Sequence, residues 1–411
     1  MKRPATFGVV VLVAILATST AAPAQTASDL FSRTELQRVD LWLHSADWAK
    51  LRAEFQTNTY YPADFTWSGQ TVNNVGIRSR GRGSRSSNKP GLRVDFDRYT
   101  TGGRFLGLKS LVLDNVTQDA SGIHESVSMA FYERLGIPAP RELHTRLYVN
   151  GEYFGLYVIV ESIDKEMLAR VFGAIGDDTQ NDGWLYEFKW ADNWFFSYLG
   201  ADLREYMLRF EATTHESRSD EEKYRPIEAL VRTVNNTPLD RFAADVGAKL
   251  DIPKAIRFIA AQVFLGETDG FLGGFGINNL YLYRLENSDV HVFIAWDADN
   301  TFYHPEYPTN SGINDNVLMR AVMAIPEYQA LYWEEMRRNV QMAEEGDWLN
   351  TEIIRHIQRI DTAMKEDPVK PHSNAAYEGE AGEMLTFARA RIAFVRCELE
   401  RGAGNASCRT Q

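Results

Sequence analysis

The chain has 411 residues, a formal net charge of −12, 44% hydrophobic residues and only two cysteines. This length is enough to bury the core of one large two-part domain or of two smaller domains. The negative charge argues against sequence-independent binding to nucleic acid or to an anionic membrane, because both are negatively charged as well. We therefore expect no nucleic acid among the partners.

The N-terminus has the pattern of a secretory leader. Residues 1–3 give a positive start, residues 7–17 are apolar but too few to span a bilayer, and residues 22–24 are small. This pattern predicts a signal peptide over residues 1–24 and export to the periplasm, the extracellular space or the cell surface. No later run approaches membrane-spanning length, so no transmembrane segment is expected after cleavage. Residues 25–35 are small and polar and are predicted to form a linker.

Residues 36–163 are predicted to form a β-rich N-terminal lobe. Short strand-like runs near residues 63–67, 76–80, 92–96 and 110–113 are separated by Gly, Asn and charged turns. One helical pattern begins at Ser121 and stops at Gly136, and a hairpin is expected around Asn150-Gly151.

Residues 164–402 are predicted to form a mainly helical C-terminal lobe that contains a hairpin over residues 266–302, and residues 403–411 are predicted to be a tail. Helical periodicity covers residues 165–172, 224–235, 239–250, 253–265, 327–344, 351–364 and 383–401. The polar segment 367–382 is expected to be an exposed connection. The predicted fold class is therefore α+β, with the bilobal layout of an atypical protein-kinase-like fold. Cys397 and Cys408 favour a disulfide in an exported chain, with two free thiols as the alternative.

The predicted hairpin carries polar residues at its mouth. Asp269 lies in a Gly-rich loop, Asn279 opens the run LYLYR, and Asp297 follows the returning run HVFIAW. Protein kinases place their catalytic base and their metal-holding residues in this order, because a carboxylate orients the acceptor hydroxyl while oxygen ligands hold magnesium on the phosphates. Asp299 is a second acid in the same turn, and no HExxH, GxSxG or GxxxxGK[ST] motif points to another chemistry.

Residues 78–85, RSRGRGSR, form a basic, Gly-rich turn in an otherwise acidic chain. Backbone amides and guanidinium groups together make a site for phosphate oxygens, although basic surface turns are also common without a ligand.

These segments, together with "GLKSLVLDN", "YVNGEYFGLYVIVESID" and "NDGWLYEF", resemble the spore coat protein H (CotH) kinase family, whose members are atypical secreted protein kinases. The resemblance runs from Val75 to Phe302. It implies an exported kinase that uses ATP and Mg (or Mn) to phosphorylate Ser or Thr of a protein substrate. Asp269 is then the catalytic residue, with Asn279, Asp297 and Asp299 at the metal. The rival interpretations are a nucleotide-binding pseudokinase or surface binding module, and AMP transfer on the same fold.

The resemblance also implies a set of cofactor-binding residues: Arg78, Arg80, Gly81 and Ser84 of the basic turn, Lys89 or Lys109, Glu125 and Glu161. Lys89 matches the family's lysine after the turn and is expected to pair with Glu125, with Lys109 as the alternative cation. Glu125 would otherwise be a carboxylate at a helix N-terminus. Glu161 is placed at the hinge that contacts adenine, or else, with Asp164, in an ordinary turn and helix cap.

Overall fold

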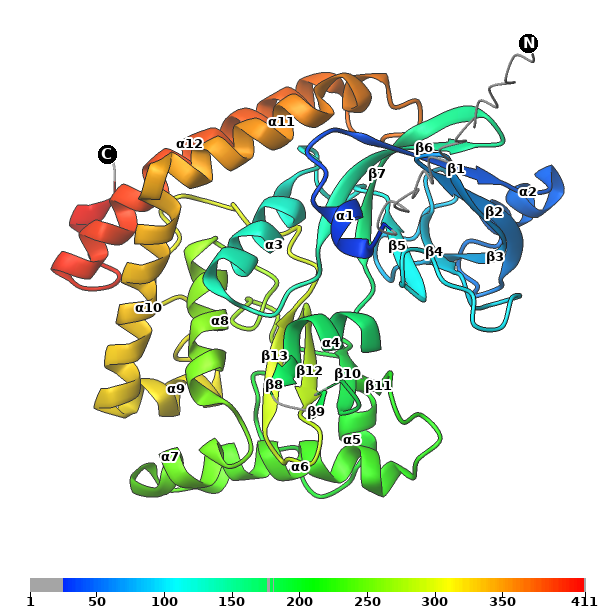
Figure 1. Ribbon diagram of the computed structural model, residues 1–411. Coiled ribbons are helices and arrows are strands. Elements are labelled where there is room, and N and C mark those ends of the chain that lie inside the picture. The colour runs from blue at the N-terminus through cyan, green and yellow to red at the C-terminus, as the bar shows by residue number, and fades with distance from the viewer. Residues whose placement is uncertain (1–24, 176–177, 180, 410–411) are drawn as a thin grey trace, which may run out of the picture.

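A computed structural model describes residues 25–175, 178–179 and 181–409 (Figure 1). The predicted signal peptide, residues 1–24, lies outside the described residues. Within the described ranges, no helix combines the length and the apolar character that a membrane span requires. The fold mixes helices and strands, as the α+β prediction expects.

The N-terminal part is a closed β-barrel with strand order β1-β2-β3-β4-β5-β7-β6. Its strands are β1 (Gln37–Trp42), β2 (Tyr61–Trp67), β3 (Gln70–Arg80), β4 (Gly91–Asp95), β5 (Ser110–Asp114), β6 (Glu142–Val149) and β7 (Glu152–Glu161). Alternate side chains fill the barrel, as Ala63, Phe65 and Trp67 of β2 show. The predicted turn at Asn150-Gly151 joins β6 to β7, and both residues have the positive φ that such a two-residue turn requires.

The predicted linker over residues 25–35 is instead part of the packed structure. It contains α1 (Ala27–Phe31), which begins with a capping box between Thr26 and Asp29. Leu30 of this helix is fully buried in the barrel core. The linker interpretation is therefore wrong, because Leu30 and Phe31 dock the segment on the barrel although the residues around them are polar. Two further helices flank the barrel strands, α2 (Ser45–Ala53) and α3 (His124–Leu135), and Gly136 ends α3 in the left-handed conformation.

The remaining chain is mainly helical around a second, larger apolar core. Its helices are α4 (Lys165–Phe172), α5 (Arg204–Met207), α6 (Asp220–Asn236), α7 (Leu239–Gly247), α8 (Ile252–Phe264), α9 (Val317–Ala324), α10 (Pro326–Glu344), α11 (Trp348–Glu366) and α12 (Asn374–Arg401), with 3-10 turns η1 (Glu345–Asp347) and η2 (Ala406–Cys408). A sheet of order β11-β10-β12-β13 crosses it, and β8 (Gly173–Ile175) pairs with β9 (Asp178–Thr179).

The predicted hairpin forms the edge of that sheet. Strand β12 (Leu280–Arg284) runs antiparallel to β13 (His291–Ala295), while β10 (Trp184–Phe188) and β11 (Phe210–Ala212) complete the sheet. In Figure 1 the hairpin lies below the barrel and beside α8. The chain just before β12 and just after β13 therefore reaches the same end of the sheet.

The last two long helices connect the helical part to the barrel. Figure 1 shows α11 and α12 running side by side across the top of the molecule toward β6 and β7. The Tyr153 hydroxyl of β7 donates a hydrogen bond to the Ala363 carbonyl of α11. At the other end, Cys397 and Cys408 form a disulfide that closes the tail onto α12, so the free-thiol alternative is wrong.

Candidate active site

A cleft of about 1070 Å³ lies between the barrel and the sheet that carries the hairpin. Most of the residues predicted from the sequence line it: Arg78, Arg80, Gly81, Ser84, Glu125, Asp269, Asn279, Asp297 and Asp299. They come from strand β3 and the turn after it, from the first turn of α3, from the loop after α8, and from the chain just before β12 and just after β13. Segments separated by about half the chain therefore contribute to one site.

Asp269 lies in a tight loop that follows α8. Its backbone N–H donates to Glu267 Oε1 at 2.8 Å, which fixes the start of the loop. Its Oδ2 accepts hydrogen bonds from the amide groups of Asn278 at 3.0 Å and Asn279 at 3.2 Å. Burial raises the pKa of Asp269 and these two hydrogen bonds oppose the rise. The carboxylate is thus held in one orientation at the cleft surface. Asn278 was not singled out from the sequence, although the Asn-Asn pair was visible there.

Asn279 and Asp297 lie at the same end of the hairpin, one residue before β12 and two residues after β13. Asn279 precedes β12 with φ of 56°, and Asp297 follows β13 with φ of 52°. Residues other than glycine rarely adopt this left-handed conformation, and Asn and Asp tolerate it best. In this backbone conformation the two residues leave the regular strands, and both of them line the cleft.

The floor of the cleft is acidic. Burial, followed by the charges of neighbouring carboxylates, raises the pKa of Asp297 to about 6 and that of Asp299 to about 9. The same causes raise the pKa of Glu125 well above its ordinary value, with Glu142 and Asp297 exerting the strongest charge effects after burial. Carboxylates that raise one another's pKa in this way gain stability when a cation joins them.

This donor set fits a magnesium or manganese ion that shares its coordination with a nucleotide. Within the described ranges, no three His, Cys, Asp or Glu side chains are grouped closely enough to hold a metal ion without other ligands. Magnesium in nucleotide sites takes one or two carboxylates and fills its other positions with phosphate oxygens and water. Asp297, with Asn279 and Asp299 beside it, supplies a set of that kind.

His124 and Glu267 support the acidic loops and were missed by the sequence analysis. The His124 ring N–H at Nδ1 donates to the Asp299 carbonyl at 2.9 Å. Burial lowers the pKa of His124, but Asp119 and Glu380 outweigh this effect and raise it to about 9. Burial raises the pKa of Glu267 to about 8. The loops that carry Asp269 and Asp299 are therefore held by buried ionisable groups behind the cleft.

The opposite wall of the cleft is basic. Gly81 has φ of 104°, and a side chain there would lie 2.6 Å from Ser84 Oγ, so this turn requires glycine. The Asn115 amide donates to the Ser84 carbonyl at 2.9 Å and to the Lys89 carbonyl at 2.7 Å, which pins both ends of the turn. Arg80 lies 3.7 Å from Asp114 and over the Trp296 ring, so it reaches from the basic wall toward the floor.

Lys89, Lys109 and Glu161 are not among the residues that line the cleft. Lys89 is 1% exposed and its Nζ lies 2.8 Å from Asp367 Oδ2, so the predicted pairing with Glu125 is wrong. Lys109 pairs with Asp97 and its side chain is 47% exposed.

Two further predictions concern the end of β7. The Glu161 carboxylate is buried between Arg141 and Arg170, with N–O distances of 2.7 Å and 2.6 Å. Asp164 caps α4 through its side chain, as the turn-and-cap alternative expects. Near the end of β7 the cleft is lined by Val160, Ser162 and Ile163, and Glu161 between them points elsewhere.

Arg93 supplies a cation on a strand at the cleft, where Lys89 was expected. It lies on β4 between Leu92 and Val94, which point into the barrel core, so its side chain projects outward. Its Nη2 donates to Ser110 Oγ at 3.1 Å, and the side chain lines the cleft. The alternation of strand β4 could have identified it from the sequence.

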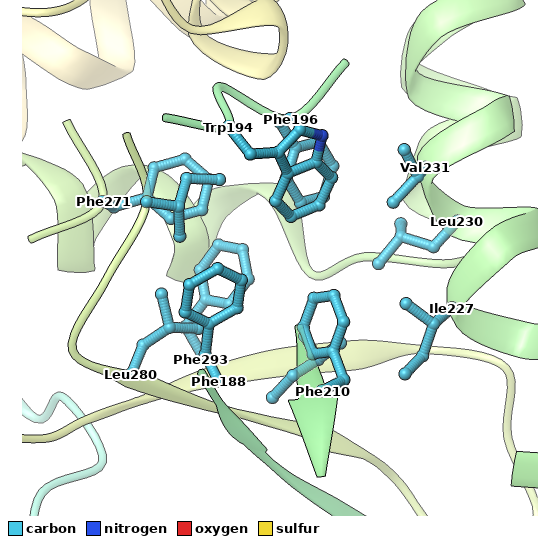
Figure 2. Close-up of a pocket in the computed structure, with 12 residues that line it drawn as sticks. Phe188, Trp194, Phe196, Phe210, Ile227, Leu230, Val231, Phe271, Leu280 and Phe293 are labelled. Atoms are coloured by element: carbon cyan, nitrogen blue, oxygen red, sulfur yellow. The ribbon is translucent and has the colours of Figure 1, made fainter. Parts of the chain in front are cut away.

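An apolar cluster supports the Asp269 loop from below. Figure 2 shows Phe188, Trp194, Phe196, Phe210, Phe271 and Phe293 facing one another around a small void of about 10 Å³. A void of this size and lining holds at most about one water and is no ligand site. Phe271 is two residues from Asp269, so the packing of these rings determines where the loop can lie.

Comparison with known proteins decides the family. The model of the CotH kinase protein family matches residues 77–395, which is most of the chain. The chain belongs to the CotH kinase family. The inner spore coat protein H of Bacillus subtilis (strain 168) is 22% identical over 383 residues, covering 90% of this chain and 99% of that protein.

Two solved structures show a distant likeness. The Helicobacter pylori proinflammatory kinase CtkA has 11% identity and a TM-score of 0.29, covering 75% of this chain and 94% of its own. HipA, solved with HipB and operator DNA from Shewanella oneidensis MR-1, has 12% identity and a TM-score of 0.36, covering 88% and 74%. These scores are too low to argue from.

Proposed function

We propose that this CotH family member is an ATP- and metal-dependent protein kinase with a bilobal, kinase-like fold. The observation that carries the proposal is the division of one cleft into a basic wall and an acidic floor, with Asp269 at its mouth. A metal-bound nucleotide has the same polarity, because its phosphates carry negative charge and its metal positive charge.

Each part of the cleft has a separate role in this proposal. Arg80, with Arg78 and the backbone of Gly81 and Ser84, holds phosphate oxygens, and Arg93 supplies the strand cation that Lys89 does not. Asn279 and Asp297 hold the metal, with Asp299 beside them. The metal, when bound, neutralises charge on the phosphates and fixes their geometry.

Asp269 receives the acceptor hydroxyl of a Ser or Thr side chain and orients it toward the phosphate. Its Oδ2 is already engaged by Asn278 and Asn279, so the other carboxylate oxygen faces the acceptor. A base in this position acts mainly in the transition state. Asp269→Ala should therefore abolish transfer and leave nucleotide binding nearly unchanged, whereas Asp297→Ala should weaken Mg-ATP binding itself.

The deciding experiment offers the purified protein γ-labelled or α-labelled ATP with magnesium or manganese, together with Ser- and Thr-containing proteins. Protein-bound γ-label that disappears in Asp269→Ala supports the kinase. Protein-bound α-label would show that the protein transfers AMP rather than the γ-phosphate, and would contradict the kinase proposal. Nucleotide binding with neither label transferred would leave a pseudokinase or binding module.

We also propose that the protein acts outside the cytoplasm. The Bacillus relative is an inner spore coat protein, and residues 1–24 have the pattern of a cleaved leader. N-terminal sequencing of the protein from an exported fraction should begin after Ala24. A cytoplasmic protein that retains Met1 would contradict export.

A further inference from the structure

Large apolar side chains gather on the surface beside Asp269. Within the described residues, eight large hydrophobic residues are exposed, and Trp190 and Phe275 are the two that also line the cleft. Phe275 is 66% exposed and Trp190 is 39% exposed. Contiguous exposed apolar surface with a polar rim marks binding sites, whereas single scattered apolar residues are normal on a protein surface.

Hydrogen bonds fix this pair in place. The indole N–H of Trp190 donates to the Phe275 carbonyl at 2.9 Å, which joins the chain after β10 to the Asp269 loop. Arg82 of the basic turn donates to the Trp190 carbonyl at 2.7 Å. We call Trp190 and Phe275 the aromatic ledge. The Trp190 indole and the Phe275 backbone are therefore held before a ligand binds, which reduces the entropy lost on binding.

A further exposed apolar residue, Leu208, lies in the chain just before β11. Strands β10 and β11 pair Phe188 with Phe210, and the Lys189 N–H donates to the Arg209 carbonyl at 2.7 Å. Leu208, which is 63% exposed, ends α5 in a helical backbone conformation, so the strand pairing does not continue to it. The exposed aromatic surface at the cleft is therefore made by Trp190 and Phe275.

We propose that the aromatic ledge binds an apolar side chain of the protein substrate, next to the Ser or Thr that reaches Asp269. The proposal relies on the proposed function for the position of the acceptor hydroxyl at Asp269. A nucleobase has apolar surface of its own in the cleft, formed by Val112, Val160 and Trp296, with Arg80 of the basic turn over the Trp296 ring.

Peptide binding tests the proposal without requiring transfer. A pool of Ser-centred peptides with randomised flanks is passed over immobilised protein with magnesium and a non-hydrolysable ATP analogue, and the retained peptides are sequenced. The parent should enrich an apolar residue at one fixed distance from the serine. Phe275→Ala should lose this enrichment and bind a selected peptide about tenfold more weakly, which is about 1.4 kcal/mol.

Trp42→Ala is the matched control, because Trp42 is an aromatic residue that is 50% exposed on the barrel and does not line the cleft. This variant should select the same peptides as the parent. Absence of apolar enrichment in the parent, or the same enrichment in Phe275→Ala, would overturn the ledge proposal.

Transfer of γ-label to the selected peptides separates the two proposals. Phe275-dependent binding without any label transfer would support the ledge and contradict the kinase. Label transfer with no preference for apolar neighbours would support the kinase and contradict the ledge.

Discussion

Replacing Lys89 by Met distinguishes a nucleotide-binding lysine from a structural one. In the structure Lys89 and Asp367 are 1% and 0% exposed, and their charged atoms are 2.8 Å apart. Burial lowers the pKa of Lys89, and the charge of Asp367 opposes this effect. The variant leaves the Asp367 carboxylate buried without its cation, a change that typically costs about 3–5 kcal/mol.

The contacts that remain around Asp367 place the expected loss near the lower end of that range. Its carboxylate still accepts the backbone N–H groups of Leu156 at 2.9 Å and Val369 at 2.9 Å. We therefore expect Lys89→Met to lower the free energy of unfolding by about 3 kcal/mol. Because Lys89 does not line the cleft, the folded variant should bind ATP nearly as the parent does.

Urea unfolding followed by tryptophan fluorescence measures the loss, and calorimetry at low temperature measures ATP affinity. The double variant Lys89→Met with Asp367→Asn removes both charges and should be less destabilised than the sum of the two single variants. Lys109→Met is the surface control and should stay within about 0.5 kcal/mol of the parent. A stable Lys89→Met protein whose ATP affinity fell tenfold or more would refute the structural assignment.

Three other changes test the basic turn, helix α12 and the buried His144. Arg80→Ala should weaken ATP binding at least about tenfold and leave adenosine binding unchanged, because only ATP carries the charges that the guanidinium pairs with. Calorimetry measures both affinities, and an unchanged ATP affinity in the variant would contradict the prediction. Buried Arg391 donates to carbonyls at the end of α8 and after the Asp299 turn, including Phe264 at 2.8 Å and Pro305 at 2.9 Å. Arg391→Lys leaves some of these carbonyls unpaired and should speed hydrogen exchange in residues 263–269 and 303–309. Unchanged exchange would show that the Arg391 hydrogen bonds do not stabilise these segments. Burial lowers the pKa of His144 from 6.5 to about 3, so the unfolded chain binds a proton that the folded chain does not, and stability should fall as the pH drops below 6.5. His144→Gln should reduce this fall between about pH 7.5 and about pH 5 in urea unfolding, while the exposed His304→Gln should not.

The sequence predicted the hairpin and its polar ends because their geometry is local. Asn279 and Asp297 flank two short strands joined by a tight connection, so the pairing of β12 with β13 is enough to bring them together. The basic turn was predictable for a similar reason, because Gly81 and Ser84 are three residues apart and determine its shape together. These features depend on spacing that can be read along the chain.

The partner of Lys89 could not be found in this way. Asp367 lies 278 residues further along, in a segment whose polar composition predicted an exposed connection. Whether a carboxylate in such a segment is buried depends on how α11 packs against the barrel, and no local pattern records that packing. The same limit applies to Glu161, whose two arginine partners come from different elements.

The charges of the cleft lead to a last prediction, that metal and ATP bind cooperatively. The floor carries Asp297, Asp299 and Glu125, and Arg80 of the wall lies 3.7 Å from Asp114. Phosphates that enter without a metal meet these acidic groups with no cation between them, and a metal without phosphates lacks ligands.

Each ligand should make the binding free energy of the other more favourable by about 1–3 kcal/mol, and this coupling must be equal in both directions. Calorimetric titration of ATP with excess magnesium and with a chelator gives the coupling from one side, and titration of manganese with and without ATP gives it from the other. Asp297→Ala should bind ATP equally well under both conditions, because it lacks the carboxylate through which the metal acts. Equal ATP affinity in the parent with and without metal would contradict both the coupling and the assignment of Asn279 and Asp297 to the metal.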